Sequence, residues 1–449
     1  MLQTSSTPVV ARLLRRFEER TAVIAVIGLG YVGLPLVKAL LDVPFKVIGL
    51  DADPEKVAAL KQGRTYIRHM PAEPFTAAFT KGQFCPTGEF GVLTEADAIL
   101  MCVPTPLTAH REPDLRFVEA STRGIAPFLR RGQLVVLEST TYPGTTGQVM
   151  KPILEAGGSR SGRDFFMAYS PEREDPGNSS YSTAAIPKVI GGDGSEALQL
   201  AEALYGTFVP KTVLVSSLEA AEAVKLTENI FRAVNIALVN ELKVLYDAMG
   251  IDVWEVIEAA KTKPFGYMPF YPGPGLGGHC IPIDPFYLTW KAREYELSTQ
   301  FIELAGQVNT QMPRYVVARL AAELDRRTGR GLNGAKVLII GVAYKKNIDD
   351  TRESPSFKLI ELLEERGASC DVHDPYVPVI PSTREHPALA GRRSVPVDTP
   401  SLAKYDVVLI ATDHDIVDYK ALVSAAKLVV DTRNACARAG AAYSNVIKA

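Results

Sequence analysis

In the first part of the chain, short apolar runs alternate with segments whose apolar residues recur at helical spacing. The clearest apolar runs are residues 98–104, 133–139, 165–170 and 212–217. Strands that alternate with helices in this way form a parallel sheet covered by helices on both faces. We therefore predict that the chain begins with a doubly wound α/β domain, with a short charged helix at its start within residues 1–20.

The alternation stops at residue 218, where a long helical pattern begins. Residues 218–249 contain neither glycine nor proline, and Gly250 follows in the position of a helix C-cap. Helix is expected again in residues 285–328, after a segment rich in proline and glycine. The alternation of strands and helices then restarts after a turn at residues 331–334.

These patterns predict three domains. Residues 1–217 and 331–449 are expected to form two Rossmann-like, doubly wound parallel-sheet domains, the second a degenerate echo of the first. Residues 218–330 are expected to form a central all-helical domain that joins them through the long helix. A chain of 449 residues is too long for one ordinary core, which agrees with this division.

Composition and charge limit the possible functions. With 47% hydrophobic and 22% charged residues, the chain has the composition of a soluble globular protein. Its formal net charge of −2 gives no general attraction to nucleic acid or to an anionic membrane, so we expect neither partner. The five cysteines are widely spaced and form no CxxC pair. This argues against a disulfide framework or a metal site and for a reducing, cytoplasmic compartment.

The hexapeptide GLGYVG, residues 28–33, follows an apolar strand and opens a helix. Its glycines would let the backbone turn sharply and approach a pyrophosphate at the helix N-terminus. The next strand ends at Asp51, where an acid can accept hydrogen bonds from the adenosine ribose and disfavours the extra phosphate of NADP. The alternative is a tight strand–helix turn followed by an unrelated acid. We predict NAD as cofactor, with contacts from Gly28, Gly30, Tyr31, Val32, Gly33 and Asp51.

Two further strand ends are expected beside the nicotinamide half of the cofactor. Residues 102–106, CVPTP, close one strand, and residues 138–145, ESTTYPGT, lie at the end of the next. Because ligands of open parallel sheets bind beyond the carboxyl ends of the strands, Thr105 and Thr140 are candidate cofactor contacts. Ordinary capping or turn formation by threonine explains the same residues equally well.

Lys225 and Asn229 lie four residues apart in the long predicted helix, so they project from one face. That face otherwise carries apolar residues, and a lysine and an amide there would need anionic or polar partners. In the simpler interpretation, the face is solvated and Lys225 pairs with Glu222 or Glu228.

Cys280 follows residues 272–278, a segment with four glycines that could pass close to a ligand. Asp284 and Pro285 are typical of a helix N-cap and a first helical residue, and a helix that starts there would favour the thiolate of Cys280. Most lone cysteines are inert core residues, but a cysteine beside so much glycine is a better candidate for reactivity.

Two charged segments complete the candidate chemistry. Glu172 lies at a strand end, where a carboxylate could act as general base, although such a segment is more often a surface turn. Lys345, Lys346 and Arg352 follow the first strand of the second α/β half, which has no GxGxxG. Their side chains could replace the glycine-rich phosphate loop.

Seven motifs in the same order resemble those of the UDP-glucose/GDP-mannose dehydrogenase family, over residues 21–434. They are GLGYVG, CVPTP, ESTTYPGT, YSPERE, AEAVKLTENIFRAVNIALVNEL, PGPGLGGHCIPIDP and GVAYKKNIDDTRESPS. Within the family, residues 170–178 and 250–288 are most similar to the bacterial UDP-N-acetylglucosamine 6-dehydrogenases. Members that act on UDP-glucose carry a second glutamate where this chain has Pro176. This weakens the UDP-glucose interpretation and leaves the role of Glu174 open.

The resemblance implies an N-terminal NAD domain, a C-terminal domain that binds the UDP part of a UDP-sugar, and a dimer built on the central helices. It implies that Cys280 is the nucleophile and that Asp284 assists proton transfer. It also assigns Lys225 and Asn229 to an oxyanion, Thr140 to the active site, and Arg352 to the cofactor. The residues expected to contact the substrate are Glu172, Lys225, Asn229, Gly277 and Lys345.

The expected reaction is an NAD-dependent, four-electron oxidation of the C6 alcohol of UDP-N-acetyl-D-glucosamine to the uronic acid, through a thiohemiacetal and a thioester on Cys280. UDP-glucose, UDP-N-acetylmannosamine and UDP-N-acetylgalactosamine are the alternative substrates. A single-step hydroxyacid dehydrogenase would share the glycine motif and the Lys/Asn pair, but it would need neither Cys280 nor a second α/β domain. A protein that binds NAD without consuming it is the non-enzymatic alternative.

Overall fold

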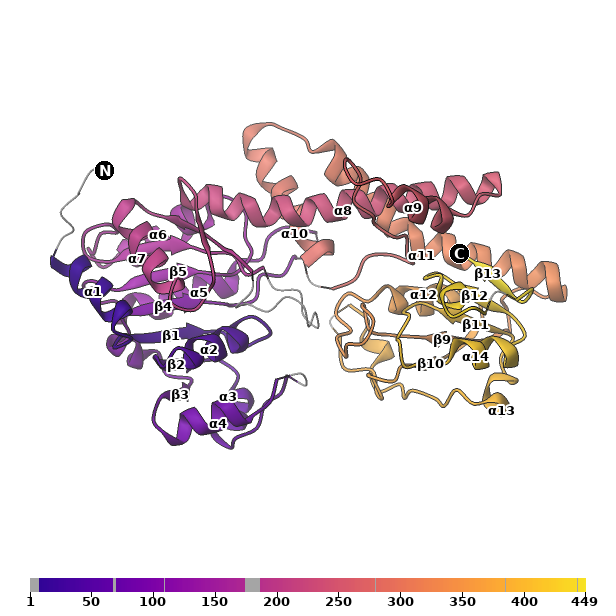
Figure 1. Ribbon diagram of the computed structural model, residues 1–449, viewed down its shortest axis with the longest axis horizontal. Helices are drawn as coiled ribbons and strands as arrows, with labels where there is room; N and C mark the ends of the chain where they lie inside the picture. The colour runs from indigo at the N-terminus through magenta and orange to yellow at the C-terminus, as the bar shows by residue number, and fades with distance from the viewer. Residues whose placement is uncertain are drawn as a thin grey trace. The chain divides into compact units, whose positions relative to one another are not determined.

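The computed structural model describes residues 8–67, 70–108, 110–173, 186–278, 280–383, 385–441 and 443–449, and for residue 280 the backbone alone. The chain divides into two compact units, residues 1–228 with 286–297 and residues 229–285 with 298–449. Among the described residues, each unit contains one β-sheet (Figure 1).

The sheet of the first unit has the strand order β3-β2-β1-β4-β5-β6-β7-β8. Neighbouring strands are parallel except β6 and β7, which pair antiparallel through Ala168–Gly192 and Tyr169–Gly191. The predicted doubly wound α/β domain is confirmed, with β7, which the apolar runs did not predict, and β8 both running antiparallel to the other strands. Mixed sheets of this kind are common among large α/β folds. The strands are β1 (Val23–Ile27), β2 (Lys46–Leu50), β3 (Phe84–Thr87), β4 (Ala98–Met101), β5 (Leu134–Leu137), β6 (Phe166–Tyr169), β7 (Lys188–Gly192) and β8 (Thr212–Leu214).

Helices cover this sheet on both faces, since every residue of β4, β5 and β6 is buried. The charged leading helix is observed as α1, whose stripe of Val10, Leu13 and Phe17 joins the main apolar cluster. The helices are α1 (Pro8–Glu18), α2 (Gly33–Asp42), α3 (Pro54–Lys61), α4 (Glu73–Thr80), α5 (Arg116–Ile125), α6 (Lys151–Glu155) and α7 (Ser195–Tyr205). Short 3-10 turns lie at Phe90–Glu95, Ala126–Phe128 and Arg293–Tyr295, and a π-helical turn lies at Thr145–Met150.

The long helix α8 spans Leu218–Met249, the bounds that the sequence predicts (Figure 1). It ends in a Schellman motif, in which Gly250 has a φ of 73°. The N–H of Gly250 donates to the carbonyl of Asp247 at 3.2 Å, and that of Ile251 donates to Tyr246 at 2.8 Å. These bonds satisfy carbonyls that the last helical turn leaves without partners.

Three further helices follow α8, and the last two overlap the helix predicted for residues 285–328, with different bounds. The helices are α9 (Val253–Ala260), α10 (Cys280–Ala292) and α11 (Gln300–Thr328). The expected helix start at Asp284 and Pro285 is wrong, because α10 begins at Cys280 and contains Pro285. Pro285 is the sixth residue of α10, beyond the first N–H groups that have no carbonyl partner, so the helix continues through it with one backbone hydrogen bond fewer.

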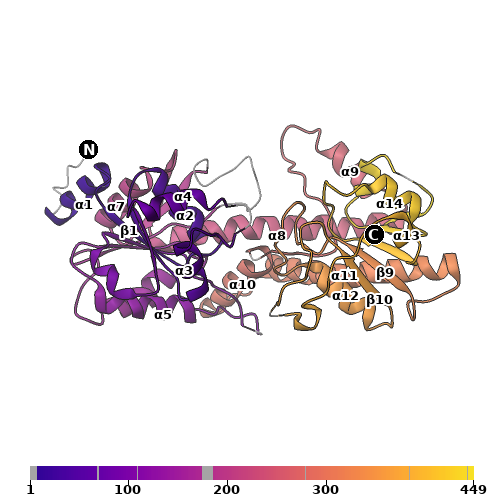
Figure 2. The same ribbon diagram turned by 90° about the horizontal axis from the view of Figure 1, so that it is seen from below.

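The second unit has an all-parallel sheet with the order β10-β9-β11-β12-β13, which reproduces the order β2-β1-β4 of the first sheet at its start. Val337 and Ile339 pack in the apolar cluster that includes residues of α11 and α12, whereas Leu338 and Ile340 pack in the cluster that includes residues of α14. Figure 2 labels these three helices around the sheet. This alternation follows the two-residue period of a strand and confirms a second doubly wound domain. The elements are β9 (Lys336–Ile340), α12 (Pro355–Glu364), β10 (Ser369–His373), a 3-10 turn (Pro387–Leu389), α13 (Thr399–Leu402), β11 (Val407–Ile410), α14 (Tyr419–Ala425), β12 (Val429–Asp431), α15 (Ala435–Arg438) and β13 (Val446–Lys448).

Among the residues that the structure describes, no helix combines the length and the apolar character needed to cross a membrane.

Glu222 fastens the first turns of α8 to the segment that follows β5. Its side chain is fully buried and accepts hydrogen bonds from the N–H groups of Gly144 at 2.6 Å and Thr146 at 2.8 Å. The hydroxyl of Thr146 donates a third bond at 2.7 Å. Burial raises the pKa of Glu222 to about 7, and these hydrogen bonds only partly oppose that rise.

We expect Glu222→Gln to change how stability depends on pH. Between pH 4.5 and pH 7 the folded wild type still binds the proton that the unfolded chain has released, so its stability falls as the pH rises. This loss amounts to about 3 kcal/mol for a shift of this size, and the variant should lack it. Urea unfolding from pH 4.5 to 8 measures the difference, with exposed Glu18→Gln as the control. Parallel profiles for wild type and Glu222→Gln would contradict this assignment.

Candidate active site

The glycine-rich turn after β1 leaves space for a ligand at only one of its three glycines. Gly28 has a φ of 90°, and a Cβ there would lie 2.6 Å from the carbonyl oxygen of Cys102. A Cβ on Gly33 would lie 1.8 Å from the carbonyl oxygen of Gly28. A Cβ on Gly30 would meet no atom within 4 Å. Packing therefore requires the first and third glycines, and open space at Gly30 fits the close approach of a pyrophosphate.

Asp51 is bonded directly to this turn from the carboxyl end of β2. It is 8% exposed, and its Oδ2 accepts a hydrogen bond from the N–H of Leu29 at 2.7 Å. Its Oδ1 accepts one from Asp53 at 2.9 Å, and the ammonium of Lys56 lies 3.3 Å away. An ionised carboxylate has about four acceptor positions, so acceptors remain for ribose hydroxyls. The partly exposed Tyr31 and Val32 lie in the same turn, and the whole arrangement fits NAD.

The next two strand ends are linked to each other and to α10. The hydroxyl of Ser139, after β5, donates to the carbonyl of Val103, after β4, at 2.7 Å. The buried hydroxyl of Tyr287 in α10 donates to the carbonyl of Thr105 at 2.6 Å. Thr140 is partly buried beside Ser139. The contacts of Thr105 and Thr140 with the cofactor stay predictions.

Glu172 meets a buried ammonium group that the sequence did not single out. Lys188, the first residue of β7, is 3% exposed and lies 3.3 Å from Glu172 and 2.5 Å from Glu138. Burial alone would lower the pKa of Lys188, but the two carboxylates raise it above its ordinary value. The Glu172 side chain is only 13% exposed, so a solvated surface turn does not describe it. Glu174 lies outside the described residues.

Lys225 is buried, and the acids that could have paired with it are bonded elsewhere. Glu222 accepts the three hydrogen bonds described above. Glu228 pairs with Arg173 at 2.5 Å. Lys225 is 6% exposed and has no hydrogen-bond or ion-pair partner within the described parts of the chain. The interpretation of Lys225 as a paired, solvated residue is therefore wrong.

Asn229, one helical turn later, is fully buried and joined to α10. Its Nδ2 donates to Asp284, which is 2% exposed, and its Oδ1 accepts from Arg232. One N–H of the amide remains for a ligand, because Nδ2 carries two hydrogens. Asp284 thus contacts α8 with its side chain and does not cap a helix.

Cys280 begins α10, one helical turn before Asp284, and its side chain lies outside the description. Gly277 and Gly278 before it pack against the loop that follows β9. A Cβ on Gly277 would lie 2.6 Å from the Cβ of Tyr344, and one on Gly278 would lie 2.8 Å from the Tyr344 ring. These two glycines therefore make room for a neighbouring loop, which is a different reason from the expected approach of a ligand.

The loop that Gly277 contacts carries two predicted ligand contacts. The carbonyl of Arg352 accepts a hydrogen bond from Gly278 at 3.0 Å, and the Arg352 guanidinium pairs with Asp350 at 2.6 Å. Lys345 is partly buried in the same loop. The structure thus brings Gly277, Lys345 and Arg352 together within the second unit.

Comparison with known proteins covers almost the whole chain. The UDP-glucose/GDP-mannose dehydrogenase family matches in its NAD binding domain over residues 22–209, its central domain over 219–311 and its UDP binding domain over 338–438. The chain is 37% identical over 394 residues to a UDP-N-acetyl-D-glucosamine 6-dehydrogenase from Pseudomonas aeruginosa, covering 87% of this chain and 90% of the relative.

Two further proteins give the same result. An NDP-N-acetyl-D-galactosaminuronic acid dehydrogenase from Ralstonia nicotianae is 35% identical over 91% of this chain and 95% of its own length. The solved structure of a UDP-D-ManNAc dehydrogenase from Pyrococcus horikoshii superposes with a TM-score of 0.82 at 33% identity, covering 92% of this chain and 96% of that one. With its NAD binding and UDP binding domains both present, the chain belongs to the UDP-glucose/GDP-mannose dehydrogenase family of NAD-dependent UDP-sugar oxidoreductases.

Proposed function

We propose that the protein oxidises the C6 alcohol of UDP-N-acetyl-D-glucosamine to the carboxylate, with two equivalents of NAD and a covalent intermediate on Cys280. The observation that carries the proposal is the buried ammonium of Lys225, which has no partner within the described parts of the chain and shares a helical face with the buried amide of Asn229. A cation kept out of water without a partner is unfavourable unless an anion binds it. An oxyanion that forms during the reaction is such an anion.

The residues of this chain divide the chemistry among them. NAD, when bound in the first domain, supplies the acceptor for hydride. The Cys280 thiolate adds to the C6 aldehyde formed in the first oxidation, because an aldehyde cannot release hydride until a nucleophile has added to it. The oxygen of the resulting thiohemiacetal carries negative charge, which Lys225 and Asn229 stabilise. After the second oxidation, water hydrolyses the thioester and returns the thiol.

Glu172 is our candidate for the base that activates this water. The ammonium of its neighbour Lys188 lies 3.3 Å away and holds the Glu172 carboxylate in place. Arg173 fixes the adjacent backbone by donating to the carbonyl of Pro187 at 2.7 Å and to Glu228. Asp284 orients Asn229 through their hydrogen bond and takes part in proton transfer.

N-acetylated sugars are the favoured substrates because relatives with several such sugars in their names match this chain at similar identity. Pro176 stands where UDP-glucose members of the family carry a glutamate, which disfavours UDP-glucose. Among these sugars we choose N-acetylglucosamine, because residues 170–178 and 250–288 are most similar in sequence to the bacterial UDP-N-acetylglucosamine 6-dehydrogenases.

We further infer that the protein is a homodimer built on α8. Phe231, Leu238 and Leu245 recur every seven residues and are 47%, 53% and 52% exposed. Residues at this interval share one helix face, and an exposed apolar stripe of this kind is typical of a helix that packs on another copy.

Replacement of the nucleophile gives the first test of function. Wild type should form two NADH for each sugar acid, and Cys280→Ala should form no acid, because the second oxidation needs the covalent adduct. Absorbance at the NADH band together with chromatography of the product measures both quantities. The exposed Cys85→Ala is the control and should behave as wild type.

Three outcomes of this test would contradict the proposal. Full activity of Cys280→Ala would end the covalent scheme. One NADH per product would favour a single-step dehydrogenase. No NADH with any nucleotide sugar would favour a protein that binds NAD without consuming it.

Replacement of Lys225 by methionine should separate activity from stability. Loss of one oxyanion donor typically lowers kcat by about 10²–10³-fold. The melting temperature should stay the same or rise, because the variant no longer buries a charge that lacks a partner among the residues the structure describes. Steady-state kinetics and thermal unfolding measure the two effects, with the exposed Lys211→Met as control. A parallel fall in activity and stability would indicate a structural role.

A panel of UDP-sugars tests the choice of substrate. We expect the highest kcat/KM with UDP-N-acetyl-D-glucosamine, then with the UDP derivatives of N-acetylmannosamine and N-acetylgalactosamine, and the lowest with UDP-glucose. Initial rates of NADH formation with each sugar at low concentration measure this order. A preference for UDP-glucose would show that Pro176 does not exclude it.

A further inference from the structure

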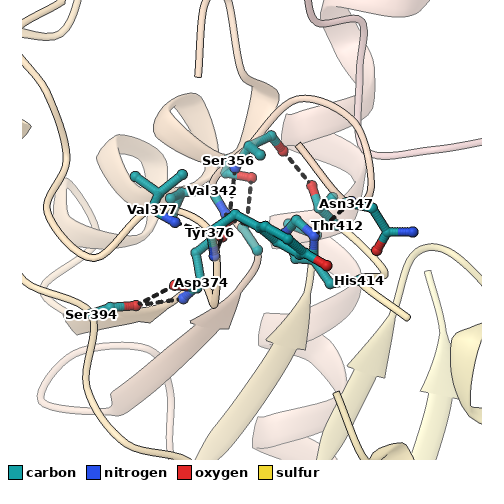
Figure 3. Close-up of polar contacts among 12 residues, drawn as sticks. Val342, Asn347, Ser356, Asp374, Tyr376, Val377, Ser394, Thr412 and His414 are labelled. Carbon is teal, nitrogen blue, oxygen red and sulfur yellow. Dashed lines mark hydrogen bonds and ion pairs between the residues drawn. The ribbon is translucent and has the colours of Figure 1, made fainter. Parts of the chain in front are cut away.

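The loop between β9 and α12, which carries Lys345, is held by residues that follow β11 (Figure 3). The hydroxyl of Thr412 donates to the carbonyl of Ala343 at 2.6 Å. The backbone N–H of Asn347 donates to Nδ1 of His414 at 2.9 Å. Both contacts join segments about seventy residues apart in sequence, and both lie within the second unit.

His414 is fully buried, and its second ring nitrogen is also engaged. Nε2 lies 3.0 Å from Oδ2 of Asp374. That carboxylate also accepts backbone N–H groups, from Val342 and Ala343 at Oδ2 and from Tyr376 and Val377 at Oδ1. Burial opposes a low pKa for Asp374, but the bonds from His414 and the backbone hold its pKa below the ordinary value.

These partners assign a donor and an acceptor role to the two ring nitrogens. A carboxylate that only accepts requires a proton on Nε2 of His414, and a backbone N–H that donates requires a lone pair on Nδ1. In this arrangement Nε2 of His414 is the donor toward Asp374, and Nδ1 is the acceptor toward Asn347. No lysine, arginine or carboxylate could supply both groups in this geometry.

The segment that His414 holds contains a residue in the left-handed region of backbone conformation. Asn347 has a φ of 64°, which is uncommon for a residue other than glycine. Asp415 accepts from the Asn347 side chain at 2.6 Å and donates its own N–H to Asn347 Oδ1 at 3.0 Å. It also pairs with Lys346 at 3.1 Å. Lys345 comes directly before these two anchored residues.

We propose that His414 is a positioning residue for substrate binding: by accepting the backbone N–H of Asn347, it fixes the loop that presents Lys345 to the nucleotide sugar. This inference rests on the proposed function, in which Lys345 contacts the substrate. His414 does not touch the substrate itself. Its acceptor nitrogen sets the conformation of the loop, and its donor nitrogen keeps the ring in the orientation that makes this possible.

Two substitutions separate the two nitrogens. In His414→Asn the amide oxygen occupies about the place of Nδ1, so the acceptor for Asn347 is kept and the donor to Asp374 is lost. In His414→Gln the amide nitrogen occupies about the place of Nε2, so the donor is kept and the acceptor is lost. We expect His414→Gln to raise the KM for UDP-N-acetyl-D-glucosamine about tenfold, with kcat and the KM for NAD nearly unchanged. His414→Asn should keep a KM near that of wild type.

Stability provides the readout that a purely structural role would not match. His414→Asn leaves the buried Asp374 with one donor fewer, so it should have the lower melting temperature of the two variants. The proposal thus expects the less stable variant to bind substrate better. A KM that follows stability across both variants would overturn it.

Lys345→Met distinguishes failure of this inference from failure of the proposed function. If Lys345→Met leaves the KM for the UDP-sugar unchanged, the assigned substrate contact is wrong. If Lys345→Met raises the KM for the UDP-sugar and His414→Gln does not, Lys345 contacts the substrate but His414 has no positioning role. Hydrogen exchange of peptides covering residues 343–350 in the wild type is independent of any variant. The Asn347 amide should exchange slowly, and rapid exchange in the folded protein would overturn the proposal.

Discussion

A carboxylate at the end of one strand that binds the backbone of the neighbouring loop is the interaction on which both α/β domains depend. In the first domain, Asp51 after β2 accepts the N–H of Leu29 in the turn after β1. In the second, Asp374 after β10 accepts the N–H groups of Val342 and Ala343 in the loop after β9. Because β2 and β10 occupy equivalent places beside β1 and β9, the two acids correspond in the fold.

The two acids differ in how many hydrogen-bond acceptor positions they leave free for a ligand. Asp51 keeps acceptor positions beside an open glycine, which suits a dinucleotide with ribose hydroxyls and a pyrophosphate. The carboxylate of Asp374 accepts hydrogen bonds from four backbone N–H groups and contacts His414. It therefore stabilises a loop and has few acceptor positions left for a ligand. Under the proposed function, the second domain uses side chains of that loop, among them Lys345, in place of a glycine-rich cradle.

Much of this architecture follows from local sequence patterns, and the parts that do not are long-range pairings. The bounds of α8 were predictable because Gly250 supplies a C-cap and no glycine or proline interrupts the helix. The turn at residues 28–33 was also recognisable from local sequence, because the spacing of its three glycines between a strand and a helix is typical of a dinucleotide-binding turn. The partner of Lys188 lies fifty residues away at Glu138, and no periodicity encodes that distance. His414 likewise meets Asp374 forty residues away.

Local sequence signals gave wrong predictions where the same residue type can serve two different structural roles. Asp284 and Pro285 have the chemistry of a helix start, yet the structure uses Asp284 to bind Asn229 and places Pro285 inside α10. Gly277 and Gly278 suggest a ligand, whereas their missing side chains accommodate Tyr344. Lys225 was ambiguous because Glu222 and Glu228 are suitably spaced, and only their other bonds removed them as partners.

The dehydrated ammonium of Lys225 has a consequence for how the enzyme would discriminate between bound states. A neutral hydroxyl or aldehyde at C6 restores little of the solvation that this group lost when the chain folded. A full negative charge on the same oxygen restores much more. Under the proposed function, Lys225 therefore regains this lost solvation energy only when the oxyanion forms. The folded protein thus stabilises the oxyanion more than it stabilises the bound alcohol or aldehyde.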